Sequence, residues 1–240
     1  MSAGEGAPAV QGTDGAPDPG AVATARASAG GSPSTAPWIS VIPYEEASGD
    51  LRSAYDWQAA RLGAPTEFTV LGSLHAPLVL ERLRLYKTVE SVPSRLSPKE
   101  RAFAAFVTST LNRTAYCASG ARLKLLHAGL DGSALNGLVR DLEATRLGVA
   151  AGGSLGAALP STGDGRLDAI ASYAIRLTLN PGGVTADDVD SLRRAGLDDL
   201  DILDVNNVVA YYNYVNRVAN GLGLRHPIDD PAEALRAVPD

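Results

Sequence analysis

Cysteine is almost absent from this chain of 240 residues, which contains one, Cys117. A single cysteine cannot form a disulfide within the chain, and it cannot supply the several thiolates of a zinc–cysteine site. The composition therefore excludes a small secreted scaffold held together by disulfides. No cationic segment followed by an apolar signal-peptide core is present either, so we expect a cytoplasmic protein.

Long apolar runs, basic charge and aromatic residues are also scarce. No stretch of about 18 apolar residues exists, which excludes a membrane span. The net charge of −6 argues against nucleic acid as a partner, because phosphate binding needs a basic surface. The three histidines show no metal-ligand spacing, and we expect neither a metal nor an organic cofactor. Aromatic residues make up 5% of the chain while alanine and glycine abound, which is typical of helices packed through small side chains.

Composition divides the chain into three parts. Residues 1–37 include 29 of the types Ala, Gly, Pro, Ser and Thr, and too few large apolar side chains to offset the entropy of ordering, so we expect a disordered tail. Residues 38–224 are predicted to form one helical domain, with a flexible Gly/Ala-rich loop at 148–165. Residues 225–240 form a C-terminal extension.

The apolar spacing between these loops is helical almost throughout, which predicts an all-α protein. Ser97, Pro98 and Glu100 combine an N-cap, a first-turn proline and a capping-box glutamate, so a helix should begin there. Thr185 and Asp188 give a weaker start of the same kind, and the last helix is expected over about 199–221. The apolar faces of two earlier helices are assigned to Leu51, Tyr55, Ala59 and Leu62, and to Leu78, Leu80, Leu83, Leu85 and Val89.

Three segments resemble one known family. They are LSPKERAFAAFVTSTLNRTAYCAS from Leu96, LTLNPGGVTADDVDSLRRAGL from Leu177 and YYNYVNRVA from Tyr211. In this order they are similar to the carboxymuconolactone decarboxylase and alkylhydroperoxidase D superfamily, closest to its peroxidase-related branch. The resemblance spans roughly residues 38–224 and implies an alkylhydroperoxidase D-like helical bundle.

The resemblance also implies an active site, and the chain departs from it. The peroxidase branch uses a Cys-x-x-Cys pair, a glutamate and a histidine to reduce peroxide through a disulfide. The corresponding positions here are Thr114, Cys117, Ala102 and Ala121, so three of the four functional residues are missing. A two-cysteine cycle is therefore excluded within one chain.

The remaining catalytic candidates are Thr114, Tyr116, Cys117 and Ser119. Cys117 opens a helix, which could lower its thiol pKa, but we favour a small buried hydrophobe retained by packing. Thr114 and Ser119 could bind a substrate oxygen, but we expect at least one to cap the helix. Tyr116 is either a wall of the site or a proton donor.

Substrate-binding candidates lie elsewhere in the chain. His75 stands at a helix junction and could line a cavity. Tyr212, Asn213 and Asn216 belong to the last helix, where amides recur on one face among apolar residues. That face either joins helices or subunits or orients a small polar ligand, and we favour the structural role because buried amides need partners.

Three functions remain open. The first, which we favour, is an enzyme whose peroxidase site has been rebuilt for non-redox lyase, isomerase or cyclase chemistry on a small organic molecule, as in bacterial secondary metabolism. The second is a thiol-dependent peroxidase or oxidoreductase that uses Cys117 alone. The third is a catalytically silent helical subunit or binding protein. The resemblance also implies a homo-oligomer.

Overall fold

The structure is a computed structural model that describes residues 37–91, 94–153 and 161–224. All of them belong to one compact unit, Ser34–Asp240. The predicted disordered tail, apart from Pro37, and the C-terminal extension lie outside the described residues and stay predictions. So does the expected homo-oligomer.

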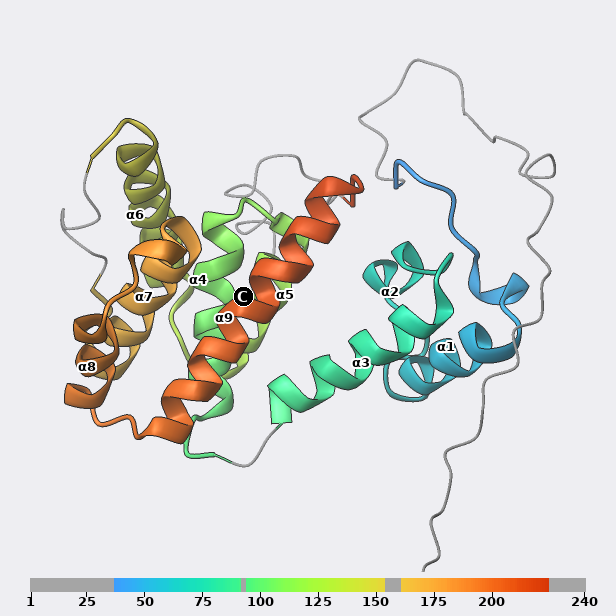
Figure 1. Ribbon diagram of the computed structural model, residues 1–240, viewed down its shortest axis with the longest axis horizontal. Coiled ribbons are helices and arrows are strands. Elements are labelled where there is room, and N and C mark those ends of the chain that lie inside the picture. The colour runs from blue at the N-terminus through green and yellow to red at the C-terminus, as the bar shows by residue number, and fades with distance from the viewer. Residues whose placement is uncertain (1–36, 92–93, 154–160, 225–240) are drawn as a thin grey trace, which may run out of the picture. The chain divides into compact units, whose positions relative to one another are not determined.

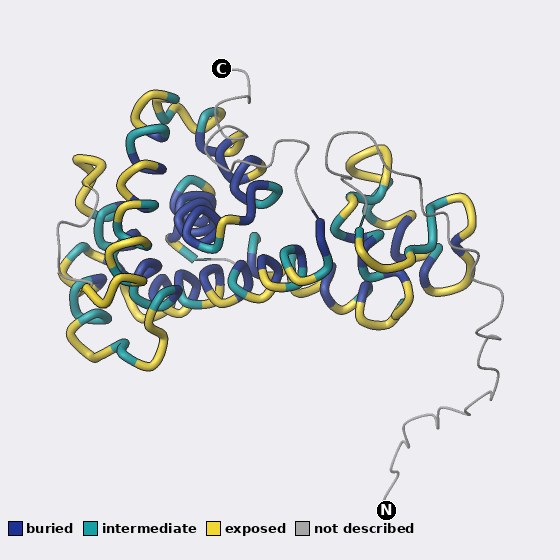
Figure 2. The backbone as a smooth tube through the Cα atoms, turned by 90° about the horizontal axis from the view of Figure 1, so that it is seen from above, coloured by how far each residue is buried: buried dark blue, intermediate teal, exposed yellow. Residues whose placement is uncertain are grey.

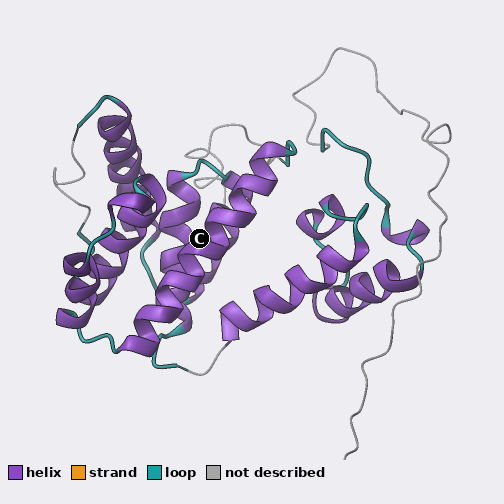
Figure 3. Ribbon diagram, in the orientation of Figure 1, coloured by secondary structure: helices purple, strands orange, loops and turns teal. Residues whose placement is uncertain are grey.

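Every long element of the described residues is a helix, which confirms the all-α prediction (Figures 1 and 3). No described helix is long and apolar enough to cross a bilayer. Short 3-10 turns occur at Tyr44–Glu46 and Pro181–Gly183. The helices are α1 (Gly49–Leu62), α2 (Glu67–Leu71), α3 (Ala76–Ser91), α4 (Pro98–Leu111), α5 (Ala115–His127), α6 (Gly132–Ala150), α7 (Gly165–Leu179), α8 (Ala186–Arg194) and α9 (Asp199–Gly221).

Helix α4 forms the centre of the main hydrophobic core, and it packs against α5, α7 and α9. Its residues from Glu100 to Leu111 are all buried, and the core of the molecule is seen as dark blue tube in Figure 2. Phe103 and Phe106 have no exposed surface. A smaller core joins α1 to the first half of α3. The second half of α3 contacts α9, and Val89 belongs to the main core. Helix α3 therefore links the two cores and brings its C-terminal turns beside α9.

Capping fixes where several helices begin. The Ser97 hydroxyl accepts the Glu100 N–H at 3.2 Å, and the Glu100 carboxylate accepts the Ser97 N–H at 2.8 Å, as the sequence predicts. Asp188 accepts both the N–H and the hydroxyl of Thr185, which confirms the weaker start. The bounds of α9 agree with the expected 199–221.

Replacing Ser97 with alanine is expected to lower the free energy of unfolding by about 1 kcal/mol, because one N–H of the first turn of α4 loses its acceptor. Urea unfolding followed by circular dichroism measures the change. Ser53 provides a matched control, since it lies inside α1 and its hydroxyl bonds a carbonyl of its own helix. An effect no larger than that of Ser53→Ala contradicts the capping role.

Two expectations about the helices need correction. Helix α6 continues through Ala150, so residues 148–150 do not belong to the loop predicted at 148–165. A glycine in an exposed helix costs only about 1 kcal/mol relative to alanine, and Gly148 does not end α6. Leu62, Leu78 and Leu85 are about half exposed, because the apolar faces of α1 and α3 are narrower than the spacing suggests.

Candidate active site

Cys117 is the third residue of α5, and its half-buried side chain packs against the main core. Burial raises the pKa of its thiol to about 12. The alternative in which the helix N-terminus lowers the thiol pKa is therefore wrong. Loss of water around the sulfur outweighs the field of the helix N-terminus, which is worth about 0.3–1 kcal/mol.

Iodoacetamide is expected to alkylate native Cys117 slowly, because the thiolate is the nucleophile. With a pKa of about 12, roughly one thiol in ten thousand is ionised at about pH 8. Mass spectrometry should show a rate that still rises at about pH 10. The same chain unfolded in urea is the control and should react much faster. A native rate that levels off near neutral pH contradicts the raised pKa.

Thr114 and Ser119 hold helices together. The Thr114 hydroxyl accepts the Asn220 amide N–H at 2.9 Å, which ties the start of α5 to α9. The Ser119 hydroxyl donates to the Ala115 carbonyl one turn earlier, at 2.6 Å. Neither side chain caps the N-terminus of α5, so the expected capping role is wrong. Both hydroxyls already have a structural use.

Tyr116 reaches toward α2. Its phenol donates to Glu67 Oε2 at 2.9 Å. Burial, followed by the hydrogen bond to Glu67, raises the pKa of Tyr116. The phenol therefore stays protonated and joins α2 to α5.

His75 does not line the pocket found in the structure. It is exposed just before α3, and its Nδ1 accepts the Leu78 N–H at 3.3 Å. The position at a helix junction was predicted, but the side chain acts on the first turn of its own helix.

The amides of α9 pair with neighbouring helices, as the structural interpretation predicts. The fully buried Asn216 bonds Ser109 of α4 through both ends of its amide, at 3.2 and 3.3 Å. Asn213 donates to Thr178 of α7 at 3.2 Å and accepts from Asn112 at 2.9 Å. These contacts fix α9 against the core, so both amides already have partners.

Tyr212 has a different environment. The Glu90 carboxylate at the end of α3 accepts the Tyr212 phenol at 3.1 Å through one oxygen, and contacts Lys124 Nζ of α5 at 2.5 Å through the other. Lys124 Nζ also lies 3.4 Å from the Tyr86 hydroxyl. We call Tyr86, Glu90, Lys124 and Tyr212 the Glu90 cluster. It joins α3, α5 and α9.

The charges of the cluster stabilise one another. Burial lowers the pKa of Lys124, but Tyr86 and Glu90 outweigh that effect and the pKa is raised. Burial and then the Glu90 charge raise the pKa of Tyr212 well above its usual value. Lys124 is therefore cationic near neutral pH and Tyr212 is a neutral phenol. Within the described ranges, no group of His, Cys, Asp and Glu could hold a metal ion.

Helix α5 presents Cys117 and Lys124 on one face, since seven residues make about two turns. Ala121 lies between them in sequence, at the position where the resemblance implies a histidine, and it is buried. Ala102 of α4, at the implied glutamate, is buried as well. The two positions where the resemblance implies a glutamate and a histidine are thus part of the hydrophobic core.

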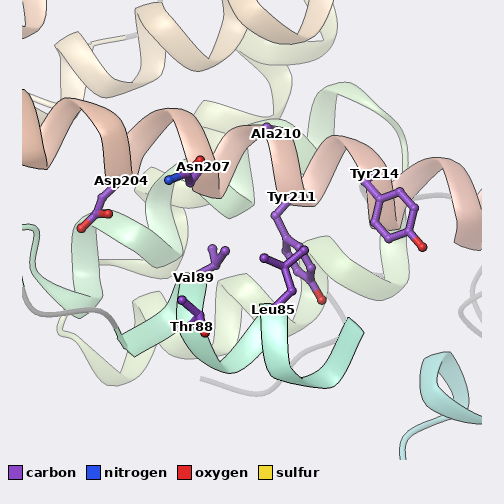
Figure 4. A pocket seen from close by; sticks show the side chains of 8 residues that line it. All are labelled: Leu85, Thr88, Val89, Asp204, Asn207, Ala210, Tyr211 and Tyr214. Atoms are coloured by element: carbon purple, nitrogen blue, oxygen red, sulfur yellow. The ribbon is translucent and has the colours of Figure 1, made fainter. Parts of the chain in front are cut away.

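A pocket of about 370 Å³ lies between α3 and α9 (Figure 4). Tyr211 links it to the Glu90 cluster, because its ring centre is 5.6 Å from that of Tyr212 and 5.9 Å from that of Tyr86. The lining residues are Leu85, Thr88, Val89, Asp204, Asn207, Ala210, Tyr211 and Tyr214. Of the sequence-predicted site residues, Tyr212 belongs to the cluster and Cys117 lies near it.

Glu90 and Lys124 were not predicted as site residues from the sequence. No motif joins them, since 34 residues separate them and Tyr212 lies a further 88 along. One weak signal existed: Lys124 falls two turns after Cys117 on the same helix. The partner on α3 could not be found without the packing of α3 against α9.

Comparison with solved structures finds seven chains with a similar fold, among them two bacterial proteins. An uncharacterized peroxidase-related protein of Ralstonia eutropha JMP134, with the alkylhydroperoxidase AhpD core, superposes with a TM-score of 0.55 at 20% identity, covering 79% of this chain and 91% of that one. An uncharacterized peroxidase-related protein of Silicibacter sp. TM1040 gives 0.51 at 22% identity, covering 78% and 86%. At such identities the likeness shows the fold. No protein-family model and no curated protein matches the chain.

Proposed function

Since the chain has the alkylhydroperoxidase D-like fold, we propose that it is a non-redox enzyme of that fold which moves protons on a small organic substrate. The observation that carries this proposal is the Glu90 carboxylate, held between the Tyr212 phenol and the Lys124 ammonium. A carboxylate, a cation and a neutral phenol are the groups that acid–base catalysis at a carbonyl compound needs.

In the proposed step Glu90 takes a proton from the carbon next to a carbonyl. The C–H electron pair becomes a carbon–carbon double bond, and the carbonyl π pair moves to its oxygen. Lys124 stabilises the resulting oxyanion, and Tyr212 donates a proton or a hydrogen bond to it. Return of the proton to a different atom gives an isomer. The step needs no oxidant, because every electron pair stays in the substrate.

Thiol chemistry with Cys117 alone is less well supported. A thiol with a pKa of about 12 is a poor nucleophile near neutral pH, and the chain has no second cysteine to resolve an oxidised one. In the proposed enzyme Cys117 is a wall residue near the Glu90 cluster.

Deuterium exchange at an enolisable acid tests the proposal. Phenylpyruvate in D₂O loses its benzylic proton signal in the NMR spectrum as the enol forms and reverts. The wild-type chain should accelerate this loss over buffer, and Cys117→Ala should keep most of the acceleration. The chain should not consume hydroperoxide in the presence of added dithiol. Hydroperoxide consumption that depends on Cys117 supports the one-cysteine peroxidase instead, and no activity in either assay favours a silent subunit.

A further inference from the structure

The solvent-facing side of α9 is apolar where a surface helix normally carries charged side chains. Leu200, Leu203 and Tyr214 are 50%, 53% and 40% exposed, and the exposed positions between them contain no charged residue. The next exposed position is a cation, Arg217. We call these exposed residues the α9 seam: Leu200, Leu203, Asn207, Ala210, Tyr214 and Arg217.

The spacing of the α9 seam is that of a helix-packing surface. Its residues follow one another at intervals of 3, 4, 3, 4 and 3, which is the 3.5-residue period of the a and d positions in a coiled coil. Side chains with this period keep facing one partner helix along several turns. A single asparagine among them, Asn207, is also typical of such surfaces, where it helps to fix the register. The α9 seam therefore indicates a second helix as its partner.

The apolar surface continues from α9 onto α3. Asn207, Ala210 and Tyr214 lie along one side of the pocket between the two helices (Figure 4). Leu85 lines the same pocket from α3 and is 50% exposed. A helix packed on the α9 seam can therefore also cover Leu85, so the contact is wider than one helix face.

The intervals of the α9 seam read the same in both directions, so the seam is complementary to an antiparallel copy of itself. In that arrangement Leu203 meets the partner's Tyr214. Asn207 meets the partner's Ala210, whose small side chain leaves room for the amide. A surface that pairs with itself in this way is what a two-fold symmetric dimer requires.

The charges at the two ends of α9 favour the antiparallel direction. Asp199 begins α9 and its side chain is 84% exposed, while Arg217 lies near the C-terminal end and has no acidic partner among the described residues. Antiparallel packing brings Asp199 beside the partner's Arg217 and aligns the helix dipoles favourably. Parallel packing would place each of these charges beside its own copy.

We propose that a second copy of this chain binds to the α9 seam, with the two α9 helices antiparallel about a two-fold axis that passes between Asn207 and Ala210. The partner of this surface is thus the same surface on another chain. The proposal goes beyond the acid–base function and does not rest on it.

Light scattering after size-exclusion chromatography tests whether the α9 seam holds two chains together. At about 100 μM chain the wild type should have at least twice the mass of one chain, 24.8 kDa. Leu203→Glu should weaken the association by at least about 100-fold and reduce the mass at least by half, because symmetry buries the new charge twice. Leu147→Glu is the matched control, since this leucine is 57% exposed on α6, outside the seam, and its mass should equal that of the wild type.

Cysteine cross-linking tests the antiparallel direction. In a Cys117→Ala background, the double variant Leu203→Cys/Tyr214→Cys should form a covalent dimer on oxidation with diamide, and neither single variant should. Eleven residues of helix separate the two positions by about 16 Å, too far for a disulfide within one chain or between like positions of antiparallel helices. Circular dichroism checks that all variants fold. A monomeric wild type, a mass unchanged by Leu203→Glu, an equal loss in Leu147→Glu, or cross-linking of either single variant overturns the proposal.

Discussion

Replacing Glu90 with glutamine is expected to slow deuterium exchange into phenylpyruvate by about 10²–10⁴-fold, the usual contribution of a general base. Glutamine keeps the shape of the side chain and can still bond the Tyr212 phenol, but its amide cannot take a proton. The loss should appear mainly in kcat, because the Glu90 carboxylate acts on the reacting carbon. Rates of benzylic proton loss by NMR measure the effect.

Glu81→Gln is the matched control for this change. Glu81 lies on the same helix, pairs with Arg84 three residues on, and is exposed. The substitution removes the same charge from α3 without touching the Glu90 cluster, so the rate should stay at the wild-type value. Equal losses in the two variants would show that the effect comes from the overall charge of the helix, and the base would have to be another residue.

Replacing Arg101 with methionine is expected to destabilise the fold by about 3–5 kcal/mol. Arg101 of α4 bonds Asp204 of α9 at 2.8 Å and the Val89 carbonyl at 2.9 Å, and both members of the ion pair are about 95% buried. Its loss leaves the Asp204 carboxylate buried without its cation. The guanidinium that joins α4 to both α3 and α9 is lost at the same time. Urea unfolding by circular dichroism and fluorescence gives the change in free energy.

A second substitution separates charge from packing at this junction. The double variant Arg101→Met/Asp204→Leu removes both charges and should recover much of the lost stability, because apolar side chains of similar size replace a buried pair well. The exposed pair Arg84 and Glu81 serves as the surface reference, and breaking it should cost no more than about 1 kcal/mol. A small effect of Arg101→Met would mean that water reaches Asp204.

Local chemistry made the helix starts predictable. The capping box of Ser97 and Glu100 depends on residues three apart, and the sequence places it where the structure has it. The same holds for Thr185 with Asp188 and for the amide face of α9, whose spacing alone brings its members together. The family resemblance predicted the fold, because several motifs recur in order over most of the chain.

The site was less predictable, because its parts meet only through packing. No sequence motif surrounds Glu90 or Lys124, and the spacing of each is typical of a charged residue on the surface of a helix. The lowered thiol pKa considered as an alternative for Cys117 has the wrong sign, because a sequence shows the position of a residue in a helix but not its desolvation by neighbouring helices.

The most direct test of the account compares Cys117→Ala and Glu90→Gln in one deuterium-exchange experiment with phenylpyruvate. The account predicts that Cys117→Ala keeps at least about half of the wild-type acceleration, while Glu90→Gln keeps about 1% or less. Circular dichroism of both variants establishes that they are folded. Loss of exchange in Cys117→Ala together with an active Glu90→Gln would contradict the account. The Cys117 thiol would then be the catalytic group.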